Sequence, residues 1–240
     1  MVAVILCFVI TLIRHGQAGS RVAYDDLSDT GRQQARALGA WFGERGRRFD
    51  VVVTGGLTRQ KITAEEMLSA MEAGGAARPP VEVDARWNEF DLDAVYAGVG
   101  PQLAEADEQF CAEYEQLIRD SADPHSAAHR TWRNCDVTVV HAWIAGRFRY
   151  EGESFEDLCV RVRKALTDLP TGASVAVVTS ATPIGICIGS ALDVAPKHIM
   201  RLAAGFNSAY SEMDLRHDGP RVVSFNNVPH LADARLRTMR

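Results

Sequence analysis

The chain has 240 residues, 47% of them hydrophobic and 24% charged, a composition typical of a soluble globular protein with a sizeable core. A net charge of −5 argues against a nucleic-acid partner, because phosphate backbones require a basic surface. The five cysteines lie far apart, without a CxxC pair or a metal-binding spacing. This usage favours reduced thiols and therefore a cytoplasmic protein.

The first predicted element is an apolar run that ends abruptly in Arg14, His15 and Gly16. The run lacks the positively charged start and the small-residue cleavage site of a signal peptide, and it is too short to cross a bilayer. We therefore expect a buried central strand over residues 8–13 and no association with membranes. Residues 1–7 are either a leader or part of the native start, and the sequence leaves that choice open.

The rest of the chain alternates between β-rich runs and helical patterns. Strands are expected at 50–54, 81–83, 174–179, 208–215 and 221–225, and helices at 31–47, at 58–73 and after the capping box that begins at Ser154. This alternation predicts an α/β fold, a three-layer sandwich in which a mostly parallel central sheet has helices on both faces.

Residues 92–150 interrupt this alternation. A helical pattern that begins at Pro101 precedes a polar stretch with several histidines, among them His141. We expect a helical cap insertion over one end of the sheet, within a single domain that spans residues 1–240. The histidines are expected to be surface or structural residues, because none has a partner at a metal-binding spacing. We accordingly expect no metal and no other cofactor.

Charged side chains follow the predicted strands at the sheet edge where ligands of such folds bind. Arg14 and His15 end the first strand, and Arg59 begins the helix after the second, where free N–H groups favour an anion. Two guanidinium groups suit a phosphoryl group, and a neighbouring histidine can act as its nucleophile. Glu89, after the third strand, is the nearest candidate acid. Each residue alone also fits a plainer interpretation, as a solvated strand end, a surface helix residue or a loop carboxylate.

Segments in chain order resemble the histidine phosphatase superfamily over most of residues 8–230. They read TLIRHGQAG, LSDTGRQQARALGAWF, VVVTGGLTRQKITAEE, RWNEFD, GESFEDLCVRV and GFNSAYSEMDL. The resemblance implies that His15 is the phosphorylated histidine and that Arg14 and Arg59 hold the phosphoryl group. It also implies that Glu89 is the general acid and base and that Gln17 lies near the phosphate pocket.

One segment departs from this pattern. Residues 175–185 read VAVVTSATPIG, with Ser180 at the place of the family's second histidine. A serine hydroxyl is shorter than an imidazole, is neutral and donates one hydrogen bond. Loss of one preorganised donor costs roughly 10²–10³ in rate. Ser180 is expected to contact the phosphate, to cap the helix ahead of Pro183, or to do both.

The resemblance implies a phosphomonoester hydrolase that works through a phosphohistidine at His15, with a level of activity that Ser180 leaves open. The alternative is an impaired member that binds a phosphorylated ligand, which Ser180 and the altered Gly55-Gly56 favour. Retention of both arginines, His15 and Glu89 favours the hydrolase, because a binder needs no acid. A phosphoglycerate mutase-like phosphotransferase ranks third. The expected partner is a small phosphorylated substrate, whose identity the sequence leaves open together with the oligomeric state.

Overall fold

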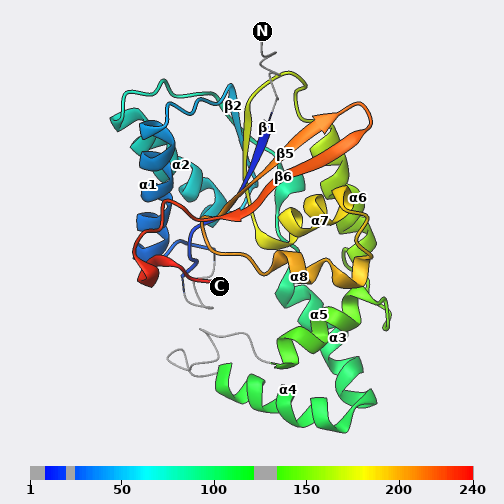
Figure 1. Cartoon of the computed structure of the whole chain (residues 1–240). Helices are drawn as coiled ribbons and strands as arrows, with labels where there is room; N and C mark the ends of the chain where they lie inside the picture. The colour runs from blue at the N-terminus through cyan, green and yellow to red at the C-terminus, as the bar shows by residue number, and fades with distance from the viewer. Residues whose placement is uncertain (1–8, 20–24, 122–133, 240) are drawn as a thin grey trace.

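The expected strands form one six-stranded sheet in a computed structural model that describes residues 9–19, 25–121 and 134–239 (Figure 1). The strands are β1 (Val9–Arg14), β2 (Val51–Thr54), β3 (Val81–Val83), β4 (Val175–Thr179), β5 (Tyr210–Arg216) and β6 (Gly219–Asn227). Their order across the sheet is β3-β2-β4-β1-β5-β6. The question of a leader at residues 1–7 lies outside the described residues.

The sheet is mostly parallel, as predicted. β1 pairs with β4, β4 with β2 and β2 with β3 in parallel, whereas β5 runs antiparallel to both of its neighbours. In the register of these pairs Arg14 lies opposite Thr179, and Thr54 lies opposite Val178. The carboxyl ends of β1, β2 and β4 therefore meet at one edge of the sheet, which is where ligands of such sheets bind.

Helices cover both faces of the sheet, which confirms the predicted three layers (Figure 1). Side chains alternate between the faces along a strand. Ile13 and Val178 pack in the cluster that holds α1 (Asp29–Glu44) and α2 (Thr58–Ala73). Leu12 and Val177 belong to the other cluster, with α6 (Phe155–Thr167) and α7 (Ala181–Ala191). Both faces of the central strands are thus buried, as their continuous apolar sequence requires.

Local sequence signals set the helix boundaries. The Ser154 hydroxyl accepts a hydrogen bond from the Asp157 N–H at 3.1 Å, so the predicted capping box begins α6. Helix α2 ends before Gly74 and Gly75, as predicted. Helix α1 ends at Glu44 rather than at 47, because the chain reverses at Gly46, whose φ is +65°.

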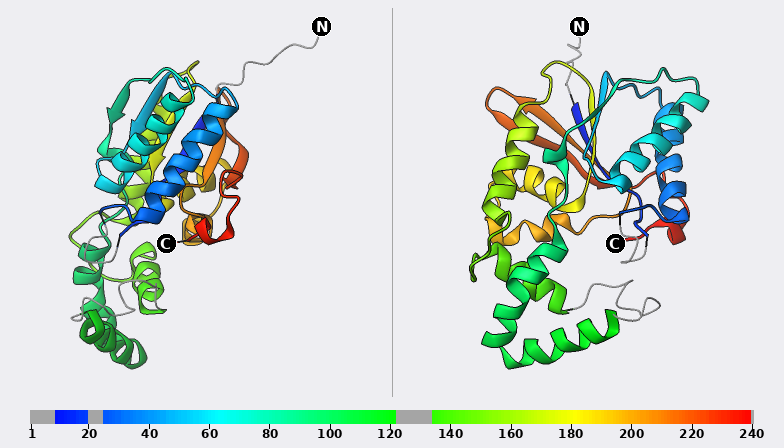
Figure 2. Two further views of the ribbon diagram at one scale, coloured as in Figure 1. Left: turned by 90° about the vertical axis from the view of Figure 1, so that its left-hand side faces the viewer. Right: turned by 180° about the vertical axis from the view of Figure 1, so that it is seen from behind.

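An inserted helical segment follows β3. It consists of α3 (Leu92–Ala106), α4 (Glu108–Ser121) and α5 (Asn134–Ile144). Figures 1 and 2 show these helices beyond the carboxyl ends of the parallel strands. The helix expected to begin at Pro101 begins instead at Leu92, because the Asp91 side chain caps the Ala94 N–H at 2.9 Å, and Pro101 lies inside it. The polar stretch at 122–133 lies outside the described residues.

The remaining elements are short: η2 (Ala85–Trp87), η4 (Pro196–His198), α8 (Met200–Ala203) and η5 (Ala234–Leu236). Among the helices that the structure describes, none is both long and apolar enough to cross a membrane.

Candidate active site

His15 follows β1 directly and is almost completely buried, with 2% of its surface exposed. Its backbone N–H donates to the carbonyl of Thr179, the last residue of β4, at 2.9 Å. The parallel pairing of β1 with β4 thus extends one residue beyond β1 and fixes His15 beside Ser180 at the carboxyl edge of the sheet.

The hydrogen bonds of the His15 ring define its tautomer. Nδ1 lies 2.7 Å from the carbonyl oxygen of Gly16, which can only accept a hydrogen bond, so Nδ1 carries the proton. Nε2 then bears a lone pair, and it accepts a hydrogen bond from Nε of Arg59 at 3.3 Å. The ring therefore presents an unprotonated nitrogen to a guanidinium group.

The surroundings of His15 keep the ring neutral. Burial is the largest effect, and the positive charges of Arg59 and then Arg14 add to it, so the pKa lies well below the ordinary 6.5. The hydrogen bond to Gly16 opposes this shift only in part. Near neutral pH, Nε2 is consequently unprotonated and can act as a nucleophile once Arg59 releases its hydrogen bond.

Arg59 lies at the N-terminus of α2, where a carboxylate is bound. Asp25 places one oxygen 3.2 Å from Nη1 of Arg59, and its two oxygens accept from the Thr58 N–H at 3.1 and 3.2 Å. This helix terminus therefore binds an anionic group through its backbone and a guanidinium together. Asp25 was not predicted, because it lies in a loop and matches no periodic pattern or motif.

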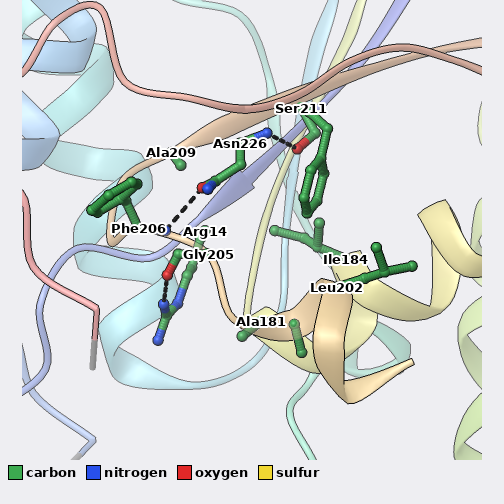
Figure 3. A pocket seen from close by; sticks show the side chains of 11 residues that line it. Arg14, Ala181, Ile184, Leu202, Gly205, Phe206, Ala209, Ser211 and Asn226 are labelled. Atoms are coloured by element: carbon green, nitrogen blue, oxygen red, sulfur yellow. Dashed lines mark hydrogen bonds between the residues drawn. The ribbon is translucent and has the colours of Figure 1, made fainter. Parts of the chain in front are cut away.

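The Arg14 side chain is buried at the end of β1 and donates to the carbonyl of Gly205 (Figure 3). It borders a small cavity with Ala181, Ile184 and Leu202. The cavity measures about 10 Å³, which is room for roughly one water molecule. His15, Arg59 and Glu89 do not line it, so it is not the place where these side chains meet.

Gly16 has a packing role. A Cβ there would lie 2.4 Å from the carbonyl oxygen of Gly31 in α1, so only glycine allows this approach of the helix. The Gly16 N–H also donates to the Thr63 hydroxyl of α2 at 3.0 Å. Close packing against α1 thus accounts for a glycine at this position.

Glu89 and Ser180 meet at the N-terminus of α7. The half-buried Glu89 accepts a hydrogen bond from the Thr182 N–H at 3.1 Å. Ser180 occupies the N-cap position, as expected, but its side chain makes no capping hydrogen bond. Its fully buried hydroxyl accepts instead from Nε2 of Gln60, in α2, at 2.9 Å.

The structure thus joins the candidate residues in two groups. Arg59 contacts His15 directly, and the Arg14 charge acts on the same ring. Glu89 and Ser180 form the second group, next to the first through the pairing of His15 with Thr179. The Gln17 side chain contacts Ser28 instead: its oxygen lies 3.4 Å from the hydroxyl of this residue, the N-cap of α1.

No metal-binding group of three or more histidine, cysteine, aspartate or glutamate side chains occurs among the residues that the structure describes. The donors around His15 are guanidinium and backbone N–H groups, which suit an anion rather than a cation.

Fold and site together define an α/β protein with a buried histidine and arginines at the carboxyl edge of its sheet. The chain belongs to the histidine phosphatase superfamily (branch 1), whose model matches residues 10–143 and 129–228. A search of curated protein sequences gave no significant match.

Solved structures share the fold at low identity. Phosphoserine phosphatase from Entamoeba histolytica, in complex with 3-phosphoglyceric acid, is 18% identical with a TM-score of 0.60, over 93% of this chain and 98% of that chain. YhfR from Bacillus stearothermophilus is 18% identical with a TM-score of 0.65, also over 93% of this chain and 98% of that chain. Mycobacterial glucosyl-3-phosphoglycerate phosphatase is 19% identical with a TM-score of 0.57, over 91% of this chain and 98% of that chain.

Proposed function

We propose that the protein hydrolyses phosphate monoesters through a phosphohistidine on Nε2 of His15. The observation that carries the proposal is the state of this ring, which is buried, neutral and unprotonated at Nε2, beside the Arg59 guanidinium. Membership of the superfamily supports it. The named phosphatases among the solved structures suggest a small phosphorylated substrate for this chain too.

In the first step Arg59 releases Nε2 of His15 and turns to the phosphoryl oxygens, the freed Nε2 lone pair attacks phosphorus, and the bond from phosphorus to the ester oxygen breaks. Arg14 and Arg59 balance the charge on the phosphoryl oxygens. Glu89 in its acid form gives its proton to the departing oxygen, which leaves as an alcohol. In the second step Glu89, now a carboxylate, takes a proton from water. The resulting hydroxide attacks phosphorus, the bond from phosphorus to Nε2 breaks, and inorganic phosphate leaves a neutral ring.

Ser180 fits a hydrolase whose hydrogen-bond donors to the phosphoryl oxygens are weakened but still present. Its oxygen accepts from Gln60, so its hydroxyl hydrogen can be offered to a phosphoryl oxygen. Gln60 also donates to the Trp87 carbonyl at 3.1 Å, which fixes the position of the serine. Replacement of an imidazole by this hydroxyl lowers the rate without removing the nucleophile.

A phosphoryl-ligand binder is the second candidate. It is favoured by the fully buried Ser180 hydroxyl, a weaker donor than an imidazole, whereas Asp25 at the N-terminus of α2 competes with any phosphoryl ligand. The two candidates differ in what they require of His15 and Glu89, because a binder needs neither a nucleophile nor an acid.

The test is hydrolysis of aryl and alkyl phosphates, with and without a chelator. His15→Ala should abolish turnover, and His141→Ala, on the exposed face of α5, should leave it unchanged. Glu89→Gln should slow alkyl esters, whose leaving groups need a proton, more than aryl esters. Unchanged turnover in His15→Ala would refute the hydrolase mechanism. Absence of turnover in the wild type, with phosphate binding that falls on Arg14→Ala, would favour the binder.

A further inference from the structure

The tripeptide His15-Gly16-Gln17 is held at both of its ends by buried side-chain amides. The His15 carbonyl lies 3.4 Å from Nδ2 of Asn207. The Gln17 N–H donates to Oε1 of Gln34, in α1, at 2.8 Å. Asn207 and Gln34 are both fully buried. The backbone on either side of the Gly16 carbonyl, which orients the His15 ring, is therefore held by two residues far apart in sequence, together with the Ser208 N–H, which donates to the His15 carbonyl at 3.2 Å.

Both amides converge on one hydroxyl group, that of Thr238. Nε2 of Gln34 donates to Oγ1 of Thr238 at 2.9 Å, and the Thr238 hydroxyl donates to Oδ1 of Asn207 at 3.0 Å. The hydrogen bonds thus close a ring that runs from the Gln17 N–H through Gln34, Thr238 and Asn207 to the His15 carbonyl. The Thr238 carbonyl also accepts from the Asn207 N–H at 2.8 Å, which holds this part of the chain in place.

The directions of these bonds require a hydroxyl at position 238. The Gln17 N–H can only donate, so Gln34 must turn its oxygen toward it and its NH₂ group toward Thr238. The His15 carbonyl can only accept, so Asn207 must turn its NH₂ group toward it and its oxygen toward Thr238. Position 238 must therefore accept one hydrogen bond and donate another at the same time. Serine and threonine can do this, whereas valine, of the same shape as threonine, can do neither.

We propose that Thr238 is a positioning residue for the His15 nucleophile, an inference that rests on the proposed function. Thr238 acts through Gln34 and Asn207, which fix the peptide planes on both sides of Gly16 and so aim the Nδ1–H of His15 at the Gly16 carbonyl. A correctly aimed Nδ1–H keeps Nε2 unprotonated, so that its lone pair, which accepts from Arg59 in this structure, can pass to the substrate. Displacement of a catalytic group by about 1 Å costs roughly 10²-fold in rate.

The test compares Thr238→Val with Thr238→Ser. Valine should lower kcat roughly 10–100-fold, the usual cost of losing a supporting hydrogen bond, and should leave KM within about threefold. Serine should restore kcat to within about twofold of the wild type. Thr167→Val is the matched control, because that hydroxyl bonds only locally, to the Lys164 carbonyl of α6 at 3.0 Å, and it should change neither constant.

Nitrogen NMR of the His15 ring gives a readout that does not depend on turnover. The ring of the wild type and of Thr238→Ser should show the proton on Nδ1, and Thr238→Val should show a changed signal. If valine does not fold, Thr238→Ala replaces it, because alanine likewise can neither accept from Gln34 nor donate to Asn207.

A kcat unchanged in the valine variant, or lost equally in the serine variant, would overturn the proposal. If the wild type hydrolyses no ester, the proposed function fails and the NMR comparison alone decides. A His15 signal identical in the wild type and in the valine variant would then refute the positioning role, and a signal altered by valine and restored by serine would support it.

Discussion

Asp25 is the residue that most directly opposes phosphate binding. Its carboxylate contacts Arg59 and the Thr58 N–H, the two groups that the anion site of α2 offers to a phosphoryl oxygen. A phosphate must displace this carboxylate or share its donors. The pair is half exposed on the aspartate side, so it is worth roughly 0.2–1 kcal/mol.

Asp25→Asn should therefore strengthen the binding of inorganic phosphate, by about two- to fivefold, because the competing charge is removed. Calorimetric titration measures this directly and requires no turnover. Asp26→Asn is the matched control. The Asp26 carboxylate pairs with Arg32 instead of Arg59, at 3.3 Å, so its loss should leave phosphate affinity unchanged. Weaker phosphate binding in Asp25→Asn would show that the aspartate supports the site rather than competes for it.

Individual site residues were predictable where they directly follow strands. Arg14, His15 and Arg59 could be placed together because parallel strands end at one edge. Asp25 and Thr238 could not, because each reaches the site from a loop whose path depends on tertiary contacts rather than on periodicity. Gln34 lies in a segment that resembles the family's, but its role was not predicted, since the partners of a buried glutamine in a helix cannot be deduced from the sequence.

At the level of elements, the approach of α1 to α2 determines how the loop after β1 and the start of α2 meet. Gly39 in α1 lies against the backbone of α2, where a Cβ would be 2.0 Å from the Met67 carbonyl oxygen. Gly43, one turn later on the same helix, has 3.7 Å of room to Met71. Alanine at position 39 therefore tests how closely the two helices pack, whereas alanine at position 43 tests helix propensity alone.

Gly39→Ala should destabilise the protein by about 1–3 kcal/mol, because α1 and α2 must move apart. Gly43→Ala should be neutral or stabilising by up to about 1 kcal/mol, because alanine is the better helix former. Urea unfolding of both variants gives the comparison. Equal effects of the two substitutions would mean that the close contact at Gly39 does not limit the packing of these helices.

Element prediction succeeded where the signals are local. Helix α2 was predicted at its observed bounds, with the Gly74-Gly75 stop, and α6 with its capping box. The start of α3 was wrong, because a proline was taken as the beginning of the helix although Asp91 provides the stronger cap. The direction of β5 was not specified, since an apolar strand pattern carries no information on parallel or antiparallel pairing.

At the scale of the whole molecule, buried histidines couple folding to pH. Burial lowers the pKa of His230 from 6.5 to about 4, and its Nε2 lies 2.8 Å from the Ser208 hydroxyl. The pKa of His15 is lowered too, again mainly by burial. A histidine with a lowered pKa binds fewer protons in the folded protein than in the unfolded protein. The free energy of unfolding therefore rises with pH between the folded-state pKa and the unfolded-state pKa, and it falls as the pH decreases through this interval.

The free energy of unfolding should therefore decrease from pH 7 to pH 5, with about 1–2 kcal/mol of the loss due to His230. His230→Gln should reduce this decrease by that amount, because glutamine does not titrate. Urea titrations of both proteins at the two pH values provide the measurement. A wild type equally stable at pH 5 and pH 7 would contradict the assignment of a neutral, buried His230.

The central claim is that His15 carries the phosphoryl group during the reaction, and its most direct test is chemical trapping. The protein is mixed with a phosphate ester labelled on phosphorus and is denatured within the time of one turnover. The bound label is then assayed for the acid lability of a phosphohistidine. We predict acid-labile label on His15 in the wild type and none in His15→Ala. The same label in His15→Ala, or no label and no turnover with a broad panel of esters while phosphate still binds, would contradict the claim.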